Sequence, residues 1–134
     1  MVAAQGQNNS AAGHIAFTVV LTNDSAQSCT LEGFPTVQLS ASGQNVATNQ
    51  TDGNPPAGAP ESLTPTLVTF TAGAAGSFVF QYIDVPSGNQ ECTSASALQI
   101  TLPGGGGTVT ASANVAPCGG NVYVSPVRAG TAAP

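Results

Sequence analysis

The chain has 134 residues, and charged side chains make up only 5% of it, against roughly a quarter in a typical soluble protein. Arg128 is the only lysine or arginine, and six carboxylates bring the net charge to −5. Because binding to phosphates requires clustered basic side chains, this composition argues against nucleic acid and anionic membrane surfaces as partners. The apolar runs are far shorter than the roughly 20 residues of a membrane helix, so we expect no membrane insertion of this domain.

The first half of the chain predicts a loose entry segment, one long strand and two short ones. Residues 1–13 have little apolar content, so we expect a loose N-terminal segment there. Residues 14–22 alternate in the manner of a strand with one face on a core. Shorter extended pieces follow at 28–34 and 36–40. Residues 41–64 are rich in Gly, Pro and Asn and almost lack large apolar residues, which predicts a weak edge strand and a long loop.

The second half repeats the strand pattern at short intervals. A run of four glycines, Gly104 to Gly107, lies between two alternating segments and is typical of a hairpin turn. Strands are expected at residues 67–71, 77–85, 97–102, 108–114 and 122–124.

Seven or eight short strands, without helical periodicity, predict an all-β fold, specifically an immunoglobulin-like antiparallel β-sandwich. We expect one domain over residues 14–128 and a frayed tail at 129–134. Aromatic residues that alternate along 77–85 could line a ligand cleft, but a sandwich core requires the same alternation. The core is expected from the large residues of one parity in each strand: Ile15, Phe17, Val19, Leu21, Val37, Leu39, Phe78, Phe80, Tyr82, Leu98, Ile100, Val122 and Val124.

Three motifs occur in order along the chain. They are Val20-Leu21-Thr22-Asn23 with Ser28-Cys29-Thr30-Leu31-Glu32-Gly33-Phe34-Pro35, then Glu91-Cys92 with Leu98-Gln99-Ile100, and Cys118-Gly119-Gly120 leading to Val122-Tyr123-Val124-Ser125-Pro126-Val127. In this order they resemble the domain of unknown function 4232 family, over about residues 13–128. The resemblance implies a secreted protein or a lipid-anchored envelope protein of a high-GC Gram-positive bacterium, and the family name attaches no activity to it.

The three cysteines, Cys29, Cys92 and Cys118, form no CxxC motif and accompany a single histidine, so they indicate a disulfide in an oxidising, extracytoplasmic compartment. Three pairings are possible, and sequence alone does not fix the connectivity. We predict Cys92 with Cys118, because the hairpin of residues 97–114 returns the chain to where it began and brings the two Cα atoms close. In the family that the chain resembles, Cys29 usually has a partner upstream, which this sequence lacks, so we expect Cys29 to be a free thiol.

Catalytic and metal-binding residues are scarce. His14 is the only imidazole, so a Ser-His-Asp or Cys-His site would have to use it, and a solvated residue at a strand end is the simpler interpretation. Asp52, Glu61, Asp84 and Glu91 lack the spacing of a calcium loop or a carboxylate pair and are expected to be solvated. We therefore predict no catalytic residue, no metal site and no cofactor.

The expected function is that of a noncatalytic extracytoplasmic binding or cell-envelope module, a monomer that binds an unidentified protein or envelope ligand. Loops on a rigid sandwich carry recognition, so the longest loop, residues 43–64, is the candidate surface, unless it is a plain disordered excursion. The alternative is a structural surface or pilus-like subunit that assembles through a sheet edge. A hydrolase is disfavoured, because the chain lacks a convincing set of acid, base and nucleophile.

Overall fold

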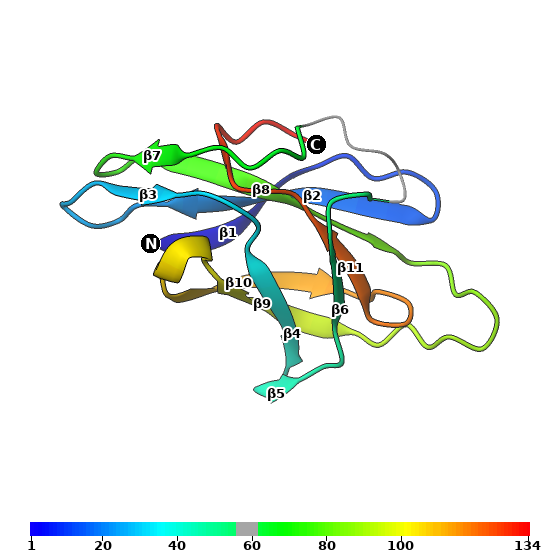
Figure 1. The fold of residues 1–134 in the computed structure, drawn as a ribbon. Coiled ribbons are helices and arrows are strands. Elements are labelled where there is room, and N and C mark those ends of the chain that lie inside the picture. Colours follow the sequence, from blue (N-terminus) through cyan, green and yellow to red (C-terminus); the bar gives the residue numbers. More distant parts are fainter. Residues whose placement is uncertain (56–61) are drawn as a thin grey trace.

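A computed structural model describes residues 1–55 and 62–134, and its regular structure is almost entirely β-strand (Figure 1). The prediction of an all-β fold is therefore confirmed. The strand count exceeds the predicted seven or eight because β1, β5, β6 and β12 carry no alternation of large apolar residues that would mark them in the sequence. The strands of the described part are β1 (Val2–Asn8), β2 (His14–Thr22), β3 (Cys29–Leu31), β4 (Thr36–Ala41), β5 (Gln44–Asn45), β6 (Asn49–Asp52), β7 (Val68–Phe70), β8 (Ala75–Ile83), β9 (Ala95–Thr101), β10 (Thr108–Val115), β11 (Asn121–Val124) and β12 (Arg128–Ala129).

Two larger sheets form a sandwich-like arrangement, with the small β3–β7 sheet beside them (Figure 1). The first sheet has the order β1-β2-β8-β11-β6, and β12 also pairs with β8. The second has the order β10-β9-β4-β5. The predicted hairpin is confirmed, since β9 and β10 pair antiparallel and a short 3-10 turn, Pro103–Gly105, lies in the connection. The pairing of β11 with β6 is parallel, unlike the other strand pairs of the described residues, which are antiparallel as predicted.

The core lies between the two sheets and is centred on β2 and β8, which pair over their full lengths. Phe17 lies opposite Phe80 with ring centroids 5.2 Å apart, and the Tyr82 ring follows at 5.9 Å from Phe80. Every residue of the predicted core is buried except Ile15, which is half-buried. Phe70 is also fully buried, but its strand has only three residues, which is too short to show a pattern.

The strand β8 is buried on both faces. Ser77 and Val79 alternate with the core aromatics and are no more than 1% exposed. The segment after β11 covers them: the Ser77 hydroxyl donates to the Gly130 carbonyl at 2.7 Å, and the Val79 N–H donates to the Ser125 hydroxyl at 2.8 Å. The burial of Ser77 and Val79 on the outer face of β8 is therefore explained by a second cover, which the segment after β11 provides.

Both chain ends differ from the prediction. In place of a loose segment, residues 2–8 form β1 and pair with β2. In place of a frayed tail, the Thr18 hydroxyl donates to the Ala132 carbonyl at 2.9 Å, and the Asn9 amide donates to the Pro134 carbonyl at 2.9 Å. Backbone and polar groups make these contacts, so the spacing of apolar side chains contains no sign of them.

Candidate binding site

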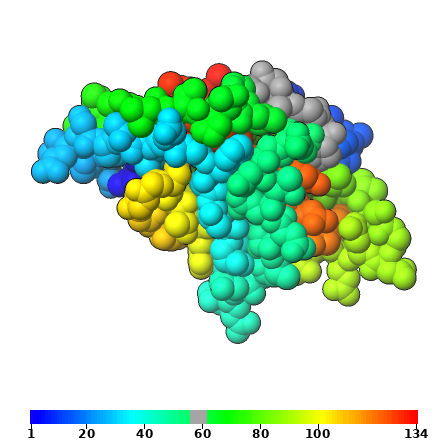
Figure 2. All heavy atoms as spheres, in the orientation of Figure 1, coloured from blue at the N-terminus to red at the C-terminus, as the bar shows by residue number. Residues whose placement is uncertain are grey.

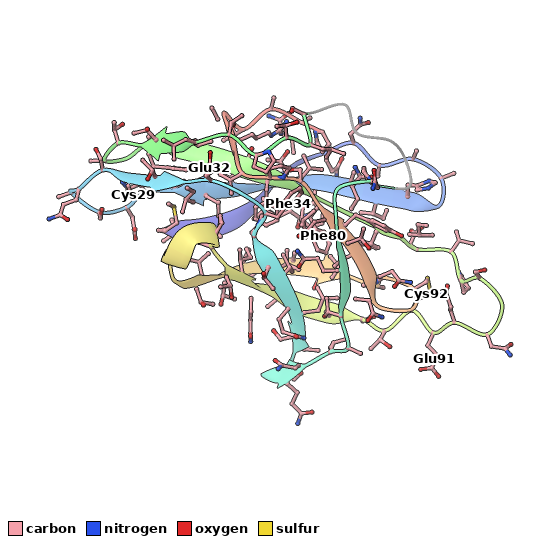
Figure 3. All side chains as sticks on the ribbon, viewed as in Figure 1. Cys29, Glu32, Phe34, Phe80, Glu91 and Cys92 are labelled. Atoms are coloured by element: carbon pink, nitrogen blue, oxygen red, sulfur yellow. A yellow bond between two sulfur atoms is a disulfide. The ribbon has the colours of Figure 1, made fainter. Side chains whose placement is uncertain are left out.

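The disulfide between Cys92 and Cys118 confirms the predicted pairing and lies where β9 and β11 begin (Figure 3). The two Cα atoms are 3.8 Å apart. Two backbone hydrogen bonds flank the disulfide: the Cys118 N–H donates to the Ile83 carbonyl at 3.0 Å, and the Gly119 N–H donates to the Glu91 carbonyl at 2.8 Å. The turn before β11 is thus held against the segment before β9.

A third segment reaches the same turn because β6 runs parallel to β11. The Asn49 N–H donates to the Gly120 carbonyl at 2.8 Å, and the Asn49 side-chain amide donates to the Gly119 carbonyl at 3.1 Å. Gly120 has φ +71°, and a Cβ at this position would overlap the Ala47 carbonyl. This close approach of two backbones requires glycine.

The three segments surround an open hollow of about 530 Å³, which we call the disulfide hollow. In Figure 2 the orange atoms of the turn before β11 lie between the teal β5–β6 region and the yellow-green loop before β9. The lining combines small apolar side chains with three polar ones. It consists of Asn45, Val46, Ala47, Glu91, Thr93, Pro117, Gly119 and Gly120.

The polar side chains of the disulfide hollow are free to meet a ligand. Asn45, Glu91 and Thr93 are exposed, and within residues 1–55 and 62–134 their side chains make no hydrogen bond or ion pair. A carboxylate accepts hydrogen bonds, whereas an amide and a hydroxyl both donate and accept them. The hollow therefore offers one negative charge and several hydrogen-bonding groups beside an apolar wall.

The one arginine is used elsewhere, on the outer face of the first sheet. The half-buried Arg128 guanidinium donates to the Ser77 hydroxyl at 3.1 Å, to the Thr18 hydroxyl at 3.3 Å and to the Ala132 carbonyl. These bonds fix the C-terminal segment over β2 and β8. The disulfide hollow has no basic side chain in its lining, so its chemistry favours uncharged or cationic ligands over anions.

The residues considered as catalytic or metal-binding do not assemble into one site. His14 begins β2, and its backbone pairs with Ala11. Asp52 ends β6, Asp84 follows β8, and Glu61 lies outside the described residues. In the part of the chain that the structure describes, no three His, Cys, Asp or Glu side chains are grouped so as to hold a metal ion.

The candidate loop, residues 43–64, contributes to the site only in part. Residues 45–47 line the disulfide hollow, 49–52 form β6, and 56–61 lie outside the described residues. The sequence interpretation missed the contribution of the Gly119-Gly120 pair, although adjacent glycines next to a cysteine are a signal of close backbone approach. Cys29 lies apart from this site, half-buried in β3 beside the core.

No helix in the described residues is long and apolar enough to cross a membrane. No curated protein and no solved structure matches the chain. A family model described as Domain of unknown function (DUF4232) matches residues 1–128. This span begins before the strand at which the sequence resemblance started, in agreement with β1 being an integral strand of the first sheet. The chain therefore belongs to the domain of unknown function 4232 family.

Proposed function

We propose that this domain is a noncatalytic, extracytoplasmic binding module that receives a lysine or arginine side chain of a partner protein in the disulfide hollow. The observation that carries the proposal is a free carboxylate, Glu91, in a hollow that also has apolar walls from Val46 and Pro117. Lysine and arginine side chains combine an aliphatic stem with a charged head, so they match this combination. A neutral apolar side chain would use only half of it.

The disulfide supports both the compartment and the mechanism of the proposal. Disulfides persist in oxidising environments, which favours an extracytoplasmic location. The Cys92–Cys118 link also fixes two of the three segments that form the hollow before any ligand arrives. A preformed site lowers the entropy lost on binding, so a small contact area can still give measurable affinity.

The charge of the whole domain supports a basic partner. The net charge is −5, and Arg128 is bound to hydroxyl and carbonyl groups of the first sheet. The surrounding field therefore attracts cationic partners over a distance of about one Debye length, roughly 8 to 10 Å in physiological salt. We expect the association rate to fall as salt is added.

The test is a selection of peptides from a random library displayed on phage, with the folded domain immobilised. We expect the selected peptides to share a lysine or arginine and to bind Glu91→Gln about tenfold more weakly, the loss typical of a charge-assisted hydrogen bond. Glu32→Gln is the matched control, because Glu32 is also exposed and lies far from Glu91 (Figure 3).

Two results would contradict the proposal. One is a library that yields no binder. The other is a set of binders whose affinity falls equally in Glu91→Gln and Glu32→Gln, since that would show a response to net charge and not to the disulfide hollow.

A further inference from the structure

A second hollow has a volume of about 380 Å³, and some of its lining residues are sequence neighbours of residues that line the disulfide hollow. Thr93 and Pro117 line the first hollow, whereas their neighbours Ser94 and Ala116 line the second. We call it the Tyr82 hollow. Its lining comprises Tyr82, Asp84, Ser94, Ala95, Asn114, Val115 and Ala116.

Three elements form the Tyr82 hollow: the end of β8, the start of β9 and the end of β10. The β9–β10 pairing shifts register between Ser112 and Val115, so β10 has two residues where β9 has one. Such a bulge re-aims the side chains beside it and is frequent at binding sites. Asn114, one of the two bulged residues, lines the hollow.

Three polar side chains of this hollow have no partner in the described residues. Asp84, Ser94 and Asn114 are exposed, and within residues 1–55 and 62–134 their side chains form no hydrogen bond or ion pair. They come from three different segments but line one hollow. Their hydrogen-bonding groups are therefore available to a ligand that enters the hollow.

The remaining lining is mostly apolar. Val115 and Ala95 are buried and pair across the two strands. Tyr82 is only 6% exposed, so its ring belongs to the core. The hollow thus combines an apolar floor with a mixed rim of one carboxylate, one amide and one hydroxyl.

We propose that the Tyr82 hollow binds one sugar residue of a neutral saccharide. A sugar ring has apolar C–H surface and a rim of hydroxyls that each donate and accept hydrogen bonds, which matches a floor of Val115 and Ala95 with a rim of Asp84, Ser94 and Asn114. The hollow has no basic side chain, which disfavours an anionic ligand.

The experiment follows the backbone amide signals of the labelled domain by NMR during titration with neutral trisaccharides of glucose, mannose and N-acetylglucosamine. We expect at least one of them to shift the signals of residues 94 and 114–116, with a dissociation constant on the order of 1 mM. Asn114→Ala should weaken that binding about fivefold and Asp84→Asn about tenfold. Ser112→Ala, exposed on the same strand and outside the hollow, should bind like the wild type.

This inference is independent of the peptide proposal, because the two hollows share no lining residue. Glu91→Gln should leave saccharide binding unchanged. The proposal is overturned if no trisaccharide shifts these signals at about 10 mM, well above the expected dissociation constant. It is also overturned if Asn114→Ala binds like the wild type, or if lysinamide, a cationic probe, shifts these signals and the saccharides do not.

Discussion

Asn23 is a buried polar residue on which the local backbone depends. It is 2% exposed, and its amide donates to the carbonyls of Gln27 at 2.7 Å and Phe70 at 3.0 Å. Its side-chain oxygen accepts from the backbone N–H and the hydroxyl of Ser25. One side chain thus joins the end of β2 to the end of β7. In the sequence, Asn23 indicates only a turn, because asparagine is common in turns whatever its tertiary contacts.

We expect Asn23→Ala to lower the free energy of unfolding by about 2 to 4 kcal/mol, because buried carbonyls lose their donor. Urea unfolding measures the change. Asn8→Ala is the control, since Asn8 is exposed and its loss should change stability by less than about 0.5 kcal/mol. Equal stabilities of the two variants would show that the Asn23 contacts contribute little.

Tyr82 makes the stability of the domain sensitive to alkali. Burial raises the pKa of its phenol above the ordinary value of 10, and the nearby Asp84 carboxylate adds to the rise, while the Ala116 N–H opposes it. The unfolded chain therefore loses this proton first as the pH increases. The contribution of the protonated Tyr82 phenol to the free energy of unfolding is complete below about pH 10. It is lost as the pH rises through the higher pKa that this phenol has in the folded protein.

The measurement is urea unfolding at a series of pH values from about 8 to 11, spanning the ordinary phenol pKa. We expect the free energy of unfolding to fall at the alkaline end in the wild type and to fall less steeply in Tyr82→Phe. An identical slope in both proteins would assign the alkaline loss to other groups.

At the scale of elements, strands with alternating large apolar residues could be predicted, and strands without that alternation, such as β1 and β6, could not. β2, β8 and β9 place large residues at every second position, so the buried face is visible in the sequence. β6 consists of Asn, Gln, Thr and Asp, and backbone pairing with β11 holds it in place. The disulfide hollow depends on that pairing, so the sequence indicated a candidate surface at residues 43–64 but not the segments before β9 and β11 that complete the hollow.

Substitution of glycine in the turn before β11 tests the close approach of Gly120 to the Ala47 carbonyl, which shapes the disulfide hollow. Gly120 and Gly104 have nearly the same φ, +71° and +67°, but only Gly120 has a neighbour where a Cβ would lie. Gly104→Ala should therefore cost about 1 to 2 kcal/mol from the backbone conformation alone. Gly120→Ala should cost at least about 1 kcal/mol more, because the Ala47 carbonyl must move. Equal losses of unfolding free energy in the two variants would contradict this prediction, because the β5–β6 connection would then move aside without destabilising the domain.

At the scale of the whole molecule, one covalent link joins the segments around the candidate site. Cys92 and Cys118 are 26 residues apart, and a loop of this length restricts the unfolded chain by about 3 to 4 kcal/mol. We expect reduction to lower the melting temperature, and thiol titration of the unfolded, unreduced protein to find one free group, Cys29. A titration that finds none or three, or a melting temperature unchanged by reduction, would contradict this assignment.

The family assignment and the core could be predicted because both rest on residues close together in sequence or repeated at period two. The ends of the chain could not. In the sequence, Arg128 is an isolated charge. In the structure, its guanidinium donates hydrogen bonds to the hydroxyls of Ser77 and Thr18, which are more than 50 residues away in the chain. Contacts of this kind depend on the completed sheet, so no local pattern indicates them.

The central claim is that recognition takes place at the disulfide hollow. Hydrogen–deuterium exchange of the domain, free and with a library-selected peptide at saturation, tests it most directly, since binding slows exchange of the amides it covers or stabilises. We expect slower exchange at residues 45–49, 91–93 and 118–121 and no change across β4 and the middle of β9. Slower exchange confined to β4, β9 or β10, with those three segments unchanged, would contradict the claim.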